Sequence, residues 1–158
     1  MTTANTEVVT HRHLQPREVV AAWLLRFDAM AHVLAGVVVF LPRESIQSLH
    51  AYLVGSELLP DIPILWYFAR GLPAYYALHG AVVLFMSFDL KRYLDLIRFS
   101  MRAFAGYGLL MLVVDLQAGM PKAWTIAEPV FALVFSATVL WLLSSSMWEN
   151  QPPPGERT

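Results

Sequence analysis

Four long apolar runs, separated by polar or proline-containing segments, dominate the pattern of this chain. Each run has about the 20 residues that an α-helix needs to cross the roughly 30 Å hydrocarbon core of a bilayer. The pattern predicts membrane-spanning helices over about 23–41, 66–88, 97–116 and 123–147. We therefore expect an all-α fold, in the form of an integral membrane four-helix bundle.

The stretch 43–65, between the first two runs, is too polar to span a membrane. Its apolar residues Ile46, Leu49 and Leu53 recur at spacings of three and four, which places them on one face of a helix. A short helix with one apolar face is typical of a segment that lies on a membrane surface. We expect such an amphipathic surface helix between the first and second spans.

Both ends of the chain are predicted to be disordered tails. Residues 1–15 are mostly polar and lack the apolar core of a signal peptide, so we expect the first span to remain as an anchor. Residues 149–158 contain three consecutive prolines, which favour an extended end. The predicted transmembrane domain therefore covers 16–148.

Composition agrees with a membrane protein. Of the 158 residues, 57% are hydrophobic and 15% are charged, against roughly 25% charged in soluble domains. The net charge of −1 gives no argument for nucleic acid, and the absence of cysteine from the sequence excludes disulfides, thiolate metal sites and cysteine nucleophiles. The expected partner is the lipid bilayer, and a homo-oligomer or a membrane partner protein stays open.

Lysine and arginine are distributed unevenly between the predicted loops. Because cytoplasmic loops carry an excess of these residues, the richer side is predicted to be cytoplasmic. Both termini then lie in the cytoplasm, and the stretch 43–65 lies outside. The basic residues on the predicted inner side are Arg12, Arg17, Lys91, Arg92, Arg98 and Arg102, and those on the outer side are Arg43, Arg70 and Lys122.

Several short motifs give the chain a family resemblance over roughly residues 20–147. They are Phe40–Pro42, Phe68–Gly71, His79–Gly80, Phe88–Tyr93 and Glu128–Pro129. On these motifs the chain resembles small four-span bacterial membrane proteins that are related loosely to the DoxX-like group, many of them of uncharacterised function. The resemblance implies a four-helix fold in the bacterial cytoplasmic membrane, and it implies no catalytic residue.

Three ionisable residues are predicted at similar depth on the outer side: Arg70, Asp115 and Glu128. A charge within a span is costly, so these groups are expected to face the bundle and to find partners. One interpretation is an ion pair that locks two helices, either Arg70 with Glu128 or Arg70 with Asp115. The other is a polar pocket, open to the outside, for a small ligand or a proton.

A second layer, on the inner side, centres on two histidines. Asp28 and His32 are four residues apart and share a helix face, and His32 and His79 fall at matching depth on adjacent spans. The simpler interpretation is a hydrogen bond between helices; the alternatives are haem ligation, a transition metal or proton relay. Two histidines are too few for a dedicated metal site, so we expect no metal and no cofactor, with haem as the alternative. Arg26 and Arg102 belong to the same layer.

No constellation of nucleophile, base or metal ligands emerges from the sequence. We therefore expect a small integral membrane protein with a structural or accessory role that is not enzymatic. One alternative is a protein that binds haem or handles protons and electrons through His32 and His79. Another is an oligomeric transporter or channel subunit.

Overall fold

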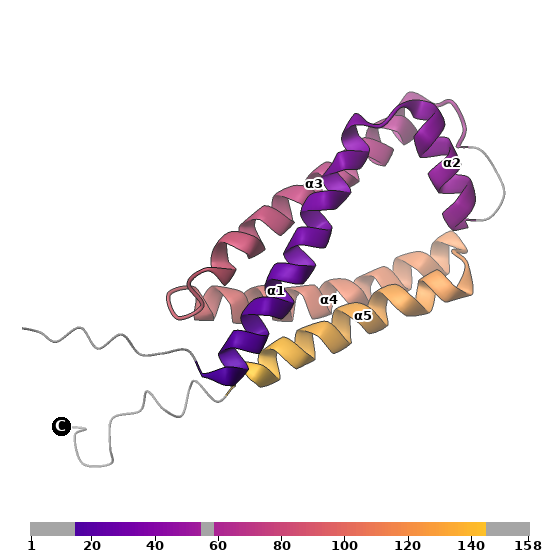
Figure 1. Ribbon diagram of the computed structural model, residues 1–158. Coiled ribbons are helices and arrows are strands. Elements are labelled where there is room, and N and C mark those ends of the chain that lie inside the picture. Colours follow the sequence, from indigo (N-terminus) through magenta and orange to yellow (C-terminus); the bar gives the residue numbers. More distant parts are fainter. Residues whose placement is uncertain (1–14, 55–58, 145–158) are drawn as a thin grey trace, which may run out of the picture.

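The computed structural model describes residues 15–54 and 59–144, and the described chain is helical, with no strand in these ranges. The predicted tails lie outside the described residues, apart from Gln15, as do positions 145–147 of the predicted fourth span. The elements are α1 (Pro16–Ala35), the 3-10 helix η1 (Gly36–Phe40), α2 (Arg43–Val54), α3 (Pro63–Ser87), α4 (Leu94–Ala118) and α5 (Lys122–Leu142), as drawn in Figure 1.

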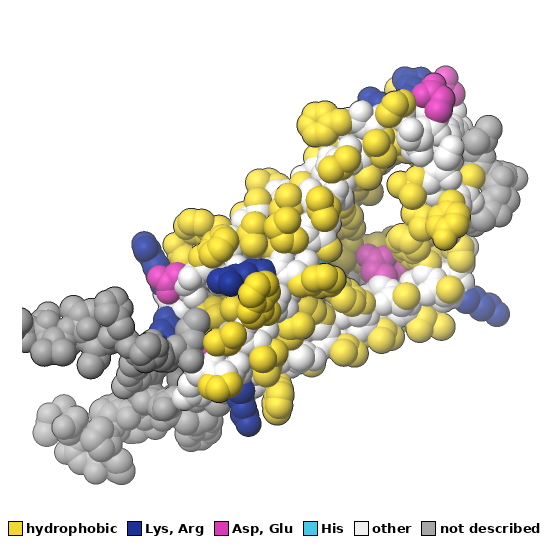
Figure 2. Space-filling model, viewed as in Figure 1, with side chains coloured by type: hydrophobic (Ala, Val, Ile, Leu, Met, Phe, Trp, Pro, Cys, Tyr) yellow, Lys and Arg dark blue, Asp and Glu magenta, His cyan; other side chains and the backbone are white. Residues whose placement is uncertain are grey.

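Three stretches of helix in the described ranges are long and apolar enough to cross a membrane: Pro16–Phe40, Leu94–Ala118 and Lys122–Leu142. This confirms an all-helical chain with the character of a membrane protein. Large hydrophobic side chains are exposed along the long helices, as a lipid-facing surface requires, and Figure 2 shows them over most of the visible face. The helix α3 has 25 residues and is not one of these three stretches; it carries Arg70 and His79 and has Pro73 inside it.

The first span begins and ends differently from a uniform α-helix. Pro16 occupies the first turn, where its missing N–H costs nothing, and Glu18 accepts a hydrogen bond from the Gln15 backbone N–H at 2.9 Å. At the other end the chain tightens into η1 from Gly36 to Phe40. A Cβ atom on Gly36 would lie 2.7 Å from the Cβ of Ala77, so glycine permits η1 to approach α3.

The long helices form two pairs, α1 with α3 and α4 with α5. In Figure 1 the pairs meet where α1 begins and α5 ends, and they separate toward α2. We call the end where the two pairs meet the closed end. The main hydrophobic core lies there and takes residues from all four long helices. Its buried members include Ala22, Leu25, Val83, Met86, Ile97, Met101, Val139 and Leu142.

Three arginines bind the ends of neighbouring helices. The last carbonyls of a helix have no partner within that helix, so a guanidinium group from another element can satisfy one of them. This arrangement places each positive charge at the negative end of a helix dipole. The donors and acceptors are Arg26 and the Ser87 carbonyl at 3.2 Å, Arg98 and the Leu143 carbonyl at 2.8 Å, and Arg70 and the Leu41 carbonyl at 3.3 Å.

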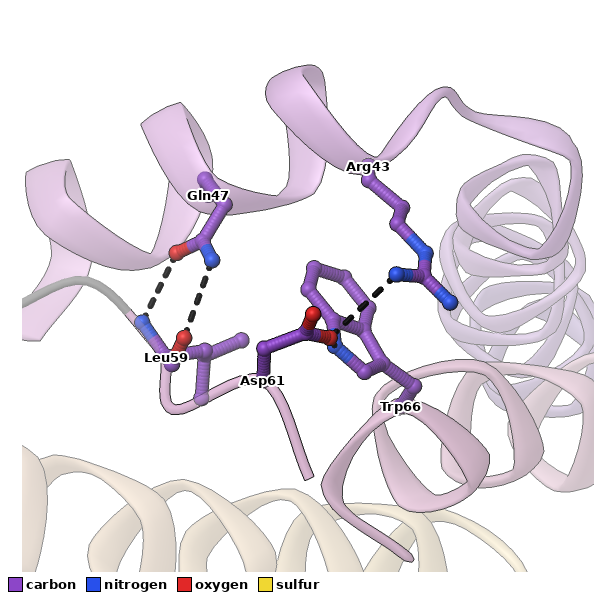
Figure 3. A network of polar contacts seen from close by, with 5 residues as sticks. All are labelled: Arg43, Gln47, Leu59, Asp61 and Trp66. Carbon is purple, nitrogen blue, oxygen red and sulfur yellow. Dashed lines mark hydrogen bonds and ion pairs between the residues drawn. The ribbon is translucent and has the colours of Figure 1, made fainter. Parts of the chain in front are cut away.

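The predicted amphipathic helix is present as α2, and it folds back on the start of α3 (Figure 3). Arg43 donates to Asp61 at 3.2 Å and stacks over the Trp66 ring, whose Nε1 donates to the same carboxylate oxygen at 2.9 Å. Gln47 exchanges two hydrogen bonds with the backbone of Leu59. These contacts hold the chain that leads into α3.

Of the apolar face of α2, only Ile46 is buried within the protein. Leu49 and Leu53 are 39% and 49% exposed, so a large part of this face remains available to the membrane surface. The helix itself is thus confirmed, and its position at the bilayer surface stays a prediction.

Replacing Gly80 by alanine is expected to destabilise the fold by about 1–3 kcal/mol, because overpacking forces backbones apart. A Cβ there would meet the Ala29 carbonyl oxygen at 2.6 Å and the Val33 nitrogen at 2.9 Å, and neither backbone atom can rotate away. Gly106→Ala is the matched control, since a Cβ on Gly106 has nothing within 4 Å. Unfolding of detergent-purified protein, followed by circular dichroism, measures both, and equal stability of the two variants would contradict the tight α1–α3 contact.

Candidate functional site

A cavity of about 270 Å³ lies where the two helix pairs begin to separate. Its walls come from α1, α3 and α4, and they consist mainly of aromatic rings and two imidazoles: His32, Tyr76, His79, Phe99, Phe104 and Tyr107. A second cavity of about 130 Å³ shares four of these residues and adds Glu128 and Phe131 from α5. All four long helices therefore contribute to one connected site.

His32 is held in a defined orientation by its own helix. Its Nδ1 lies 2.9 Å from the carbonyl oxygen of Asp28 and 3.5 Å from the Asp28 carboxylate. Both of these groups accept hydrogen bonds, so Nδ1 carries the hydrogen and the lone pair resides on Nε2. The ring lines both cavities, which leaves Nε2 as its nitrogen available to a bound molecule.

The structure brings His32 and His79 together. Their ring centroids are 5.7 Å apart in an edge-to-face arrangement, and the ring of Tyr76 is 5.8 Å from His32. Gly80 makes this possible, because it lets α1 pass directly against α3 beside His32. Within the described part of the chain, His79 has its ring contact with His32 but no hydrogen bond, and it lines the larger cavity.

A line of hydrogen bonds runs from Tyr76 across to α5. The hydroxyl groups of Tyr76 and Tyr107 are 3.1 Å apart, and Tyr107 donates to Glu128 Oε1 at 3.2 Å. The indole Nε1 of Trp124 donates to Glu128 Oε2 at 3.0 Å. Since Tyr107 gives its hydrogen to Glu128, Tyr76 donates to Tyr107, and every donor in the line points toward the carboxylate.

Phe104 is the centre of an aromatic cluster on the α4–α5 side of the site. Its ring stacks parallel to Tyr107 with centroids 6.1 Å apart, and it meets Phe131 and Phe135 edge-on at 6.5 Å and 6.4 Å. Such edge-to-face and offset contacts are favourable beyond their buried area. The cluster gives the cavity a rigid apolar wall next to the Tyr107–Glu128 hydrogen bond.

The three residues of the predicted outer layer are not brought together. Arg70 donates to the Leu41 carbonyl instead of a carboxylate. Asp115 is buried, and its Oδ2 has no hydrogen-bond partner among the described residues. Glu128 is held by neutral donors, so neither Arg70–Glu128 nor Arg70–Asp115 forms an ion pair in the structure.

The inner layer divides into two groups. Asp28, His32 and His79 gather at the site, with Asp28 buried beneath His32. Arg26 instead reaches the end of α3 and lies over the rings of Trp23 and Phe88. Arg102 is exposed and lines neither cavity.

The described residues contain no group of three or more histidine or acidic side chains arranged to hold a metal ion. His32 and His79 supply two nitrogen ligands, the number that a haem iron takes from a protein. Their rings touch each other, however, so a porphyrin can enter between them only if the two side chains separate. The arrangement is better suited to a molecule that lies beside the imidazoles in the open cavity.

The chain matches no protein-family model, no curated protein and no solved structure. The DoxX-like resemblance therefore stays an expectation from sequence.

Tyr107→Phe is expected to cost more stability than Tyr76→Phe, because Tyr107 bonds both Tyr76 and Glu128. Each hydrogen bond contributes about 0.5–1.5 kcal/mol. The double variant should be no less stable than Tyr107→Phe alone, since the shared bond is already lost. Tyr75→Phe is the control: Tyr75 is 65% exposed and has no hydrogen bond in the described chain. Additive losses in a denaturation cycle would refute the Tyr76–Tyr107 bond.

Proposed function

We propose that this chain is a four-span integral membrane protein with an accessory, non-enzymatic role: it binds a small molecule in the cavity between its two helix pairs. The observation that carries the proposal is the convergence of polar side chains from all four long helices on two cavities that share four lining residues. The chain places His32, His79, Tyr107 and Glu128 there.

The cost of such an arrangement supports a role beyond packing. A single charged residue at the centre of a membrane helix costs roughly 2.5–3.5 kcal/mol on insertion scales. A purely structural contact would satisfy these polar groups against one another. Here Tyr107 and Glu128 do bond each other, but His79 has no hydrogen bond in the described chain and lines the larger cavity.

The absence of catalytic pairing favours binding over chemistry. Nucleophilic catalysis needs a hydroxyl group hydrogen-bonded to a base. In the described ranges no serine or threonine hydroxyl bonds a histidine; those of Ser48, Ser87, Thr125, Thr138 and Ser144 bond backbone carbonyls. This pattern supports a binding protein.

The fourth span of the proposal is α3. Its 25 residues would extend about 38 Å at 1.5 Å per residue, more than a bilayer core requires. It packs closely on α1, a candidate span, and Arg70 and His79 both face neighbouring elements. With four spans, the closed end and both termini are cytoplasmic, and α2 lies on the outer side of a bacterial cytoplasmic membrane.

Because the sequence has no cysteine, single-cysteine variants can test this topology directly. In intact cells, a membrane-impermeant maleimide should label Ser45→Cys and Lys122→Cys but leave Lys91→Cys unlabelled until the cells are opened. All three side chains are exposed on the protein, so a cysteine that stays unlabelled in intact cells is shielded by the membrane and not by the fold. Labelling of position 91 and protection of position 122 in intact cells would show that α3 does not cross.

Binding is tested with single-ring aromatic probes, namely phenylbutanol, phenylbutyrate and phenylbutylamine, added to detergent-purified protein. A ligand present at a concentration 100 times its dissociation constant raises the free energy of unfolding by about 2.7 kcal/mol. At least one probe should therefore raise the Tm of the protein by roughly 5 °C. Ser100→Trp, which fills the cavity wall, should abolish the shift. Leu109→Trp, at an exposed position on the same helix, should keep it. No shift with any probe, or equal loss in both variants, rejects the proposal.

A further inference from the structure

Glu128 is an acidic residue with no lysine or arginine partner in the described chain. Both of its carboxylate oxygens accept hydrogen bonds, from the Tyr107 hydroxyl and from the Trp124 indole N–H. An ionised carboxylate has acceptors only, so two accepted hydrogen bonds suit that form. No lysine or arginine lies within ion-pair distance of Glu128 in the described ranges, and none lines either cavity.

The arginine that the sequence offers as a partner is already engaged elsewhere. Arg70 donates to the Leu41 carbonyl at the end of η1. Two neutral donors hold the Glu128 carboxylate in place without cancelling its charge. A carboxylate with no cation partner, in a cavity lined by aromatic rings, attracts a positive ligand.

The surrounding rings are suited to the same kind of ligand. Phe104, Tyr107 and Phe131 stand around the smaller cavity together with Tyr76. The faces of aromatic rings attract a cation through their quadrupole, and cages of such rings recognise organic ammonium groups. His32 and His79 add lone pairs and aromatic surface, and neither brings a fixed positive charge.

We propose that the cavity binds a lipophilic organic ammonium ion, with the ammonium group between the Glu128 carboxylate and the rings of Phe104 and Tyr107. This proposal rests on the binding function above and names its ligand class. The larger cavity, lined by Phe99 and His79, holds the apolar body of the ligand.

Two sources supply such a group: a free amine and the amino headgroup of a phospholipid. A headgroup would bring its phosphate close to Glu128, where no lysine or arginine lines the cavities to bind it. Like charges at short range repel, so the site favours the free amine.

The experiment compares benzyltrimethylammonium with neopentylbenzene, which has the same shape and no charge. Binding is measured by titration calorimetry against empty micelles, in a maltoside detergent and a phosphate buffer, because Tris and choline lipids are themselves organic cations. We expect the cation to bind at least tenfold more tightly than the neutral compound.

Two variants and one control variant identify the source of that preference for the cation. Glu128→Gln should reduce the preference to about threefold or less, and Glu44→Gln, the same change at an exposed position on α2, should leave it intact. Phe104→Leu keeps an apolar side chain and the carboxylate but removes a ring, and it should weaken binding of the cation several-fold more than that of the neutral compound.

The outcomes separate this inference from the binding function. Equal binding of the two compounds, or tighter binding of the neutral one, overturns the cation inference and leaves the cavity a binding site. Failure of both compounds and of all three aromatic probes overturns both proposals. Displacement of the cation by short-chain phosphatidylethanolamine, with no displacement by phosphatidylglycerol of the same chains, would overturn the assignment to a free amine.

Discussion

The contact of α1 with α3 at Gly80 controls the geometry of the whole site. With no side chain at this position, the backbone of α1 at Ala29 and Val33 passes directly against α3. That approach sets His32 beside His79 and turns both rings toward the gap between the helix pairs. Any wider spacing would move the α1 wall of the cavity away from Tyr76 and Tyr107.

The arginines explain how charge is distributed in this fold. Arg26, Arg70 and Arg98 each bind a backbone carbonyl at the end of a neighbouring element, where the helix dipole is negative. Each bond gives a partner to one carbonyl at a helix end, and the bonds of Arg26 and Arg98 join long helices to each other. The Nε atoms of Arg26 and Arg70 are buried with no hydrogen-bond partner in the described chain. The three arginine bonds also leave the acidic Glu128 without a cation partner among the described residues, which is why its environment suggests a positively charged ligand.

The divergence of the two helix pairs supplies the open space. The apolar core is concentrated at the closed end, around Leu25, Val83, Ile97 and Val139. Beyond this core the pairs separate (Figure 1). The aromatic cluster around Phe104 covers the α4–α5 side of the gap. A tight core at one end and a mainly aromatic cavity beyond it is an arrangement that can admit a ligand without loss of the fold.

The sequence by itself determined the all-helical chain, the apolar stretches of α1, α4 and α5, the amphipathic α2 and the shared face of Asp28 and His32. Helical periodicity and hydropathy are local properties, so they can be read from neighbouring residues. The tertiary structure alone decided that Arg70 binds Leu41, that Arg102 is exposed, and that Tyr107 joins Tyr76 to Glu128. These pairings depend on how helices approach and rotate against one another, which spacing along one helix does not specify.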